Sequence, residues 1–170
     1  SDSPGVECAY GINHVLDAVG EPPISAARIH ELRNEMTVSW RQLPAGRIHN
    51  AAAANAVQST ELVRKSLCES ERIVVEPIVF LRADRRGRTA SFRKYLDGLY
   101  SDGNVEQIHA IGPDARLLAR RVKAPVRQYD IDDHEPADIL DSAFEAGHPV
   151  LVMGNTVHEF MKGLESEIDD

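Results

Sequence analysis

The feature that most constrains this chain is an alternation of short apolar runs with segments of helical spacing. The apolar runs lie at residues 73–81, 105–111, 126–129 and 150–153. The helical patterns lie before, between and after them, at residues 59–67, 89–99, 114–121, 136–146 and 156–168. Short apolar runs separated by helices are typical of repeated βαβ crossovers. The sequence therefore predicts an α/β fold with a doubly wound, mostly parallel sheet and helices on both faces.

The N-terminal part of the chain follows other patterns. Residues 9–19 and 25–34 have helical spacing, with Ser25 placed to cap the second helix, and they predict a helical segment over residues 1–36. From residue 37 onward the spacing changes to that of a short strand pair around a Pro-Ala-Gly turn. We therefore expect the sheet domain at residues 37–170.

Composition narrows the class of protein. Hydrophobic residues make up 42% of the 170 residues, which fits a packed core, and no run of 18 apolar residues could span a membrane. From the sequence we expect no signal peptide, and the two cysteines indicate free thiols in a reducing cytoplasm. The net charge of −8 argues against nucleic acid as a partner. A cytoplasmic protein is expected.

In a doubly wound sheet, ligands bind beyond the carboxyl ends of the strands. Two nucleotide signatures are missing from those positions, because the sequence contains neither G-x-x-x-x-G-K-[ST] nor G-x-G-x-x-G. We therefore do not expect this chain to bind ATP or a dinucleotide by itself.

Arginine is concentrated directly after the longest apolar run. The segment Arg82-Ala83-Asp84-Arg85-Arg86-Gly87-Arg88 places four guanidinium groups between an expected strand and an expected helix. Such a cluster suits carboxylate or phosphate oxygens, and Asp84 can hold one arginine by a bidentate pair while the others face an anion. The alternative is a solvated turn whose arginines pair with the chain's own surplus acids.

Asparagines mark two further loops. Asn50 is expected to end a strand and Asn55 to lie near a helix start, where their amides could bind a ligand or cap the helix. Gly154 follows the last apolar run and allows close backbone approach, and Asn155 lies at the start of the next expected helix. A helix cap explains these residues equally well.

Clustered acids follow the third apolar run. Residues 130–135 have the composition of a metal site, with Asp130, Asp132, Asp133, His134 and Glu135. In a chain this acidic, such clusters are usually solvated, and we assign no metal site to them.

The order of these features resembles the C-terminal domain of Mur-type ATP-dependent amide ligases, and above all the ligase subunit of poly-γ-glutamate synthases. The segment from Asn50 to Thr60, N-A-A-A-A-N-A-V-Q-S-T, is similar to that family's N-A-F-A-A-N-D-P-x-S-T. Arg82-Ala83-Asp84-Arg85 with Arg88 is similar to its R-x-D-R-x-x-R, and residues 147–155 resemble its closing strand and G-N turn. The chain departs from the pattern at Ala52 and Ala56, where the family has an aromatic residue and Asp.

The resemblance implies a Rossmann-like lid domain in a ligase of two or three domains. A preceding central domain would bind ATP and Mg²⁺ and phosphorylate a carboxylate, and an amine would attack the acyl phosphate. This chain would hold no catalytic residue and would be inactive alone. Its substrate- or phosphate-binding residues would be Arg82, Asp84, Arg85, Arg88, Asn50, Asn55, Gly154 and Asn155. Glutamate or a γ-linked glutamate polymer would be the ligand.

Two other functions remain open from the sequence. The chain could be a non-catalytic Rossmann-like module that binds an anion or a partner, or a fragment of a peptidoglycan-precursor ligase. If the synthase resemblance holds, membrane-bound synthase subunits are candidate partners, and they would place the chain at the inner face of the membrane in capsule biosynthesis.

Overall fold

The computed structural model describes residues 38–54, 56–68, 73–154 and 158–169, with a few positions between residues 13 and 28. The chain divides into two units, Ser1–Val38 and Ser39–Asp170. In the first unit, Asn13, His14, Asp17, Ala18 and Arg28 are helical. Ser25 Oγ accepts the backbone N–H of Arg28 at 3.2 Å, as expected of a cap. The remainder of the two expected N-terminal helices lies outside the described residues.

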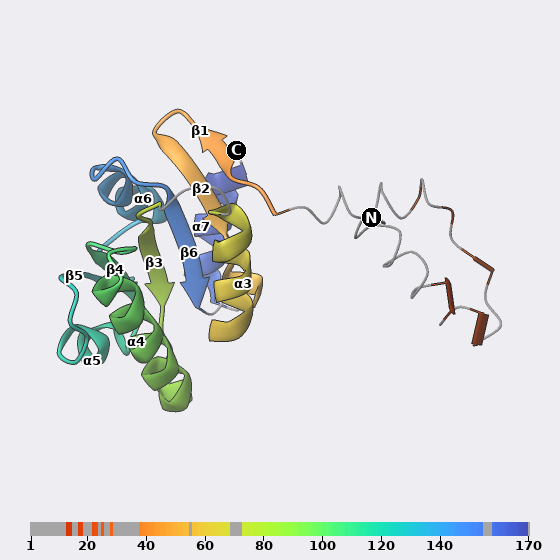
Figure 1. Cartoon of the computed structure of the whole chain (residues 1–170). Coiled ribbons are helices and arrows are strands. Elements are labelled where there is room, and N and C mark those ends of the chain that lie inside the picture. The colour runs from red at the N-terminus through yellow and green to blue at the C-terminus, as the bar shows by residue number, and fades with distance from the viewer. Residues whose placement is uncertain are drawn as a thin grey trace. The chain divides into compact units, whose positions relative to one another are not determined.

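The second unit contains a six-stranded sheet in the order β1-β2-β6-β3-β4-β5, counted over the described residues (Figure 1). The strands are β1 (Arg41–Leu43), β2 (Gly46–Asn50), β3 (Glu76–Phe80), β4 (Ile108–Ile111), β5 (Val126–Tyr129) and β6 (Val150–Gly154). Strand β1 pairs with β2 in antiparallel fashion, as the Pro-Ala-Gly turn predicted. The pairs β2–β6, β6–β3, β3–β4 and β4–β5 are parallel. The expected mostly parallel sheet is confirmed.

Helices cover both faces of this sheet (Figure 1). They are α3 (Val57–Leu67), α4 (Arg86–Ser101), α5 (Ala115–Ala119), α6 (Pro136–Phe144) and α7 (Glu159–Asp169). One core cluster joins α4 and α5 to the sheet, with α3 packed against it, and a second cluster joins α6 and α7 to the other face. The doubly wound arrangement with helices on both faces is therefore confirmed.

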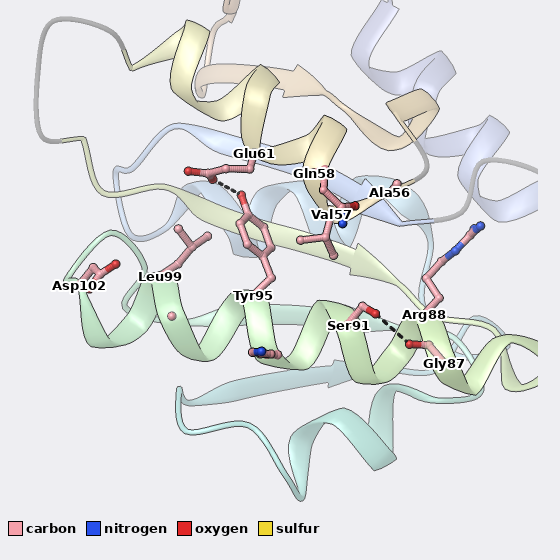
Figure 2. Close-up of a pocket in the computed structure, with 12 residues that line it drawn as sticks. Ala56, Val57, Gln58, Glu61, Gly87, Arg88, Ser91, Tyr95, Leu99 and Asp102 are labelled. Carbon is pink, nitrogen blue, oxygen red and sulfur yellow. Dashed lines mark hydrogen bonds between the residues drawn. The ribbon is translucent and has the colours of Figure 1, made fainter.

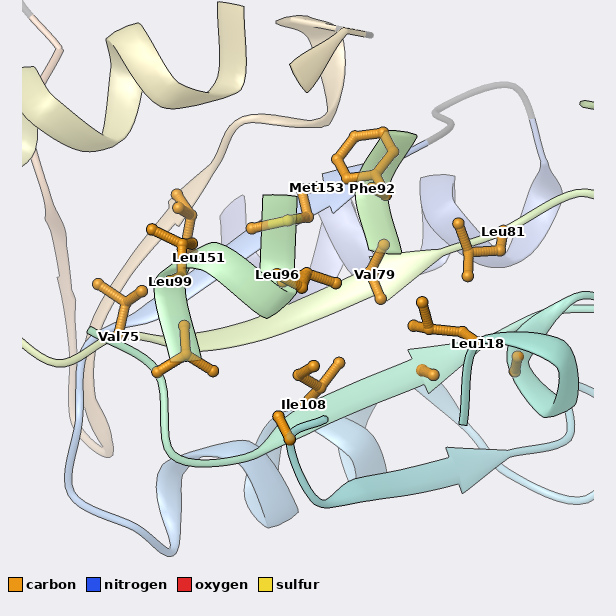
Figure 3. Close-up of a cluster of buried hydrophobic side chains, with 14 of the residues drawn as sticks. Val75, Val79, Leu81, Phe92, Leu96, Leu99, Ile108, Leu118, Leu151 and Met153 are labelled. Carbon is orange, nitrogen blue, oxygen red and sulfur yellow. The ribbon is translucent and has the colours of Figure 1, made fainter. Parts of the chain in front are cut away.

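Strand β3 shows why the apolar runs are continuous rather than alternating. Val79 points into the first cluster, which Figure 3 shows between β3 and α4, whereas Ile78 and Phe80 point into the second. All three side chains are at most 1% exposed. A strand buried on both faces needs apolar residues at nearly every position.

The arginine segment is more regular than the sequence suggested. Helix α4 was expected from residue 89, but it begins at Arg86, and a 3-10 turn at Ala83–Arg85 precedes it. The expectation of a loop over all of residues 82–88 is therefore wrong for its second half. Arginine has a good helix propensity, so the helix starts before its first buried residue, Thr89.

Strand order sets where a ligand would bind. Strands β3 and β6 are neighbours, but β3 leads into α4 on one face and the chain after β6 leads to α7 on the other. The carboxyl ends of β3 and β6 therefore form the topological switch point, where ligands of such sheets bind. The arginine segment begins at Arg82, two residues after the last residue of β3.

No helix in the described part of the chain is both long and apolar enough to cross a membrane.

Candidate functional site at the carboxyl edge of the sheet

The arginine segment is held in shape by one ion pair. Arg82 donates from Nε to Asp84 Oδ1 at 2.8 Å and from Nη2 to Asp84 Oδ2 at 2.7 Å. The sequence predicted a bidentate pair between Asp84 and one arginine, and in the structure that arginine is Arg82. The hydrogen bonds from Arg82 hold the pKa of the Asp84 carboxyl below its ordinary value. The pair fixes the plane of the Arg82 guanidinium, although both side chains remain in contact with solvent.

The other three arginines occupy the turn and the first turn of α4. Arg85 and Arg86 are exposed, and Arg88 is half-buried. Among the described residues, Arg85 makes no ion pair within 4 Å, so its charge is available to a ligand. The segment therefore combines one oriented guanidinium, Arg82, with one exposed guanidinium, Arg85, at the switch point.

Asn50 lies at the end of β2, as expected, and its side chain serves its own backbone. Asn50 Oδ1 accepts the N–H of Ala52 at 3.0 Å, which stabilises the turn after the strand. The next backbone group, the N–H of Ala51, donates to the carbonyl of Val152 in β6 at 2.8 Å. Asn55 and Asn155 lie outside the described residues.

Gly154 is the last residue of β6 and lies beside Phe80, the last residue of β3. Its φ of 108° belongs to the left-handed region, and a Cβ there would overlap the carbonyl oxygen of Phe80. The sequence predicted that the backbone would come close to another group at Gly154. In the structure that group is the backbone of Phe80 in the neighbouring strand β3. The glycine brings the ends of β3 and β6 together and so shapes the switch point.

A groove between α3 and α4 leads away from the arginine segment (Figure 2). Its volume is about 670 Å³. Arg88 and Gly87 line one end of the groove together with Ala56. The groove therefore connects the arginine segment to the asparagine-containing segment at residues 50–60. These two motifs are separate in the sequence, and the fold brings them to one place.

Sequence reasoning missed this groove, although α4 carries a signal for it. Residues that line the groove recur at helical spacing along α4 and its C-cap, namely Arg88, Ser91, Tyr95, Gly98 and the cap residue Asp102. Spacings of three and four residues put side chains on one face of a helix. A polar face that should be solvent-exposed therefore faces α3.

Tyr95 and Glu61, which line the groove, form a hydrogen-bonded triad with Arg64. Tyr95 donates its hydroxyl to Glu61 Oε2 at 2.7 Å, and Arg64 donates to both oxygens of Glu61 at 2.7 and 2.8 Å. Arg64 holds the pKa of Glu61 below its ordinary value, and burial raises the pKa of the Tyr95 phenol. Because Arg64 donates to both carboxylate oxygens of Glu61, the charge of Glu61 is neutralised within the triad.

The acidic side chains in the loops after β4 and β5 form hydrogen bonds with nearby protein groups. Asp114 is buried and accepts the hydroxyl of Thr89 at 3.0 Å, which ties the start of α4 to the loop. Asp130 Oδ1 accepts the N–H of Asp132 at 3.1 Å, and Glu135 forms a capping box with Asp138 at the start of α6. In these loops, Asp130 and Glu135 thus form hydrogen bonds with backbone groups close to them in the sequence.

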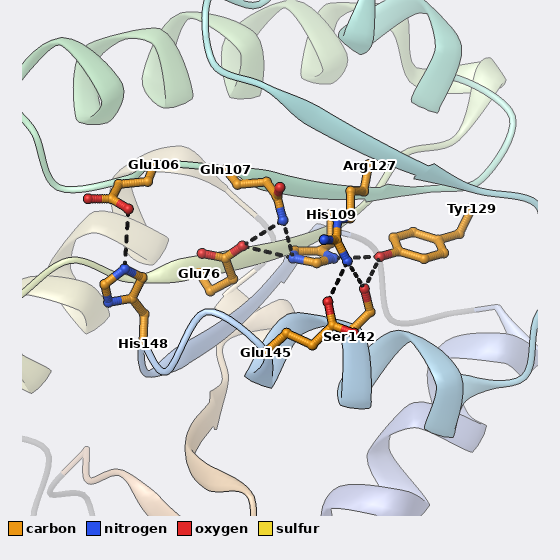
Figure 4. Close-up of polar contacts among 9 residues, drawn as sticks. All are labelled: Glu76, Glu106, Gln107, His109, Arg127, Tyr129, Ser142, Glu145 and His148. Atoms are coloured by element: carbon orange, nitrogen blue, oxygen red, sulfur yellow. Dashed lines mark hydrogen bonds and ion pairs between the residues drawn. The ribbon is translucent and has the colours of Figure 1, made fainter.

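A polar network at the opposite edge was also missed by the sequence reasoning. It connects Glu76 on β3, His109 on β4 and Tyr129 on β5 (Figure 4). Glu76 and His109 are both fully buried, with Glu76 Oε1 and His109 Nε2 separated by 2.8 Å. Glu76 falls inside an apolar run, and its partners lie more than 30 residues away in the chain, so no local pattern marked it.

The parallel sheet and its arginine segment define a class, namely a Rossmann-like α/β domain with an arginine-rich carboxyl edge. The family model of the poly-gamma-glutamate synthase CapB C-terminal domain matches residues 38–170 of this chain. The chain therefore belongs to that family, and its role lies in poly-γ-glutamate synthesis. The expected resemblance to poly-γ-glutamate synthases is confirmed at the level of this domain. A search of curated proteins finds no match.

Proposed function

We propose that this chain is the substrate-binding lid of an ATP-dependent ligase that joins glutamate through γ-amide bonds. The family match supports poly-γ-glutamate synthesis as the setting. The observation that carries the proposal is the arginine segment at the switch point, with Arg82 oriented by Asp84 and Arg85 exposed. Guanidinium groups in that arrangement bind carboxylate and phosphate oxygens with directional hydrogen bonds.

The two arginines would have different tasks. Arg82 uses two of its five N–H groups on Asp84, so the remaining three are held in a fixed plane for an anionic group. Arg85, which has no ion-pair partner among the described residues, adds a charge on the adjacent 3-10 turn. Together they would orient the carboxylates of glutamate, and closure of the lid would exclude water from an acyl phosphate.

The nucleotide would belong to another domain. The sequence of this chain contains no G-x-x-x-x-G-K-[ST] loop to hold the β- and γ-phosphates of ATP. In this proposal a preceding domain binds ATP and Mg²⁺, and synthase subunits in the membrane hold the assembly at its cytoplasmic face. The lid contributes binding and orientation only.

The groove between α3 and α4 gives the acceptor a place to lie. It starts at Arg88 and also contains Lys94, Gln58 and Ser91, which can interact with carboxylates and amides. Its volume of about 670 Å³ suits a ligand larger than a single amino acid. An acceptor chain of γ-linked glutamate would lie along it with its reactive end near the arginine segment.

The test is Arg85→Ala in the full synthase, in which this chain is joined to its ATP-binding domain. We expect kcat/KM for glutamate incorporation to fall by about tenfold or more, since a charged hydrogen bond to substrate is lost. The melting temperature should not change, because an exposed arginine contributes little to stability. Arg120→Ala removes another exposed arginine, directly after α5, and should leave the activity intact.

Unchanged activity of the Arg85→Ala enzyme would contradict the proposal and would show that the arginine segment is a solvated surface turn. An equal loss in both variants would indicate a general effect of net charge rather than a substrate site.

A further inference from the structure

A second cavity lies at the amino edge of the sheet, opposite to the arginine segment. Its volume is about 430 Å³. The lining comes from the starts of β3, β4 and β5 and from the C-terminal end of α6, and the residues are Glu76, Glu106, Gln107, Pro125, Arg127, Ser142, Glu145 and Ala146. We call this space the Glu76 cavity. The proposed lid function uses none of these residues.

Glu76 is the buried group of this cavity, and one of its carboxylate oxygens lacks a hydrogen bond. Oε1 lies 2.8 Å from His109 Nε2 and accepts from Gln107 Nε2 at 3.2 Å (Figure 4). Oε2 is buried and has no partner in the described part of the chain. Buried carboxylate oxygens are rarely left unbonded, because the loss of hydration is then uncompensated. A hydrogen-bond donor is therefore missing next to Oε2.

Glu76 cannot easily turn to satisfy this oxygen itself. His109, which holds Oε1, is in turn fixed through Nδ1, 2.8 Å from the hydroxyl of Tyr129. Tyr129 donates that hydroxyl to Ser142 Oγ on α6 at 2.9 Å. Rotation of the Glu76 carboxylate would break the first link of this chain of contacts. The missing donor must come to Glu76.

The charge of the cavity selects a cation. Three carboxylates line it, those of Glu76, Glu106 and Glu145, against the single guanidinium of Arg127. Arg127 is already paired with Glu145 at 2.8 Å. The C-terminal end of α6 adds the negative end of a helix dipole. An anion would be repelled from this cavity.

The shape and chemistry of the lining favour an organic cation. Pro125 and Ala146 supply an apolar part of the wall, against which the carbon stem of an amine can pack. Glu106 and Glu145 are 70% and 64% exposed, so they form a rim that can move to admit a small group. An ammonium group brings three N–H donors, one of which would meet Oε2.

We propose that the Glu76 cavity binds the ammonium group of an organic amine, with Glu76 Oε2 accepting one of its hydrogen bonds. The ammonium belongs either to the α-amino group of an amino acid or to a lysine side chain of a partner. The two sources share this chemistry and differ in what is attached to the amine.

The test is a titration of the full 170-residue chain with propylammonium chloride, followed by amide NMR. Saturable shifts are expected at residues around the cavity, such as Glu76, Gln107 and Ser142. Propanol, which has the same carbon stem without the charge, and potassium chloride at equal ionic strength should not reproduce them. Shifts of the same size and location with either control would overturn the proposal.

Variants separate the site from general electrostatics. Glu76→Gln should weaken propylammonium binding by about tenfold or more, because a charge-assisted hydrogen bond is lost. Arg127→Gln should tighten it by about two- to threefold, because an opposing charge near the site is removed. Glu165→Gln on α7 makes the same change of charge as Glu76→Gln, outside the cavity lining, and should have no effect.

Arg127 is exposed, so its substitution keeps the proposal testable even if Glu76→Gln fails to fold. Unchanged binding in Arg127→Gln, or in a folded Glu76→Gln, would refute the site. Two further titrants then identify the source of the amine. Tighter binding of N-acetyl-lysine amide than of alanine amide supports a lysine side chain, and the reverse order supports an amino acid. These titrations measure binding at the Glu76 cavity alone, so their outcome does not depend on whether the proposed lid function is correct.

Discussion

The carboxylate of Asp84 accepts two hydrogen bonds from Arg82, and this contact lowers its pKa. A lowered pKa means that the folded state favours the ionised carboxylate. The stabilising effect is therefore complete above the ordinary pKa of about 3.9 and is lost as the pH falls through the lowered value. At neutral pH the pair is intact, so the orientation of Arg82 does not vary with physiological pH.

Arg82→Gln should raise the pKa of Asp84 toward its ordinary value, because the main cause of the shift is removed. A ¹³C NMR titration of the Asp84 carboxyl in the isolated chain measures this directly. Arg120→Gln removes an arginine of equal charge elsewhere and should leave the titration of Asp84 as it was. An Asp84 pKa that is the same in Arg82→Gln and in the unmodified chain would show that the bidentate pair does not form in solution.

Part of the site at the carboxyl edge of the sheet could be predicted from the residue types alone. A bidentate pair between Asp84 and one arginine of the segment followed from their closeness in the sequence, but the choice of Arg82 as the partner came from the structure. The use of Asn50 did not follow, because an amide that caps a turn and an amide that binds a ligand have the same local sequence. The structure distinguishes the two, because the N–H of Ala52 donates to Asn50 Oδ1 at 3.0 Å and the side chain therefore stabilises the turn.

At the scale of elements, the junction of β3 and β6 depends on Gly154. Gly154→Ala places a Cβ against the carbonyl of Phe80 at a φ of 108°, so either the strands separate or the backbone is strained. We expect the free energy of unfolding to fall by roughly 2–5 kcal/mol. Chemical denaturation of the isolated chain measures the change.

Gly98 on α4 is the matched control. A Cβ there meets nothing within 4 Å, and the position lies inside a helix. Gly98→Ala should therefore raise the free energy of unfolding by roughly 0.5–1 kcal/mol. Similar effects of the two substitutions would contradict the close contact between β3 and β6.

The elements themselves were largely predictable, whereas their order in the sheet was not. Hydrophobic spacing is local, so it located α3 and β5 well and anticipated β3 inside a longer apolar run. The position of β6 between β2 and β3 depends on contacts between residues some 70 to 100 positions apart, such as Phe80 beside Gly154. The groove and the Glu76 cavity follow from that order, and they could not be placed before it was known.

At the scale of the whole molecule, the isolated chain should not turn over ATP. The sequence has no G-x-x-x-x-G-K-[ST] loop to hold the β- and γ-phosphates. ADP release by the purified 170-residue chain should equal that of a buffer blank, and glutamate incorporation should require the preceding ATP-binding domain. Turnover that co-purifies with the chain and is abolished by Arg85→Ala would contradict a pure lid.

The position of β6 has a consequence for how the polypeptide is made. A ribosome emits β1, β2, β3, β4 and β5 first, yet β2 and β3 are not neighbours, and each forms parallel pairs with the last strand. Until residue 154 has left the exit tunnel, the nascent sheet consists of two pieces with open, hydrogen-bonding edges. The gap between them is closed by the βαβ unit that ends in β6, so the domain reaches its folded state only after residue 154 has been translated. A nascent chain stalled before β6 would thus expose the kind of strand edges that chaperones shield.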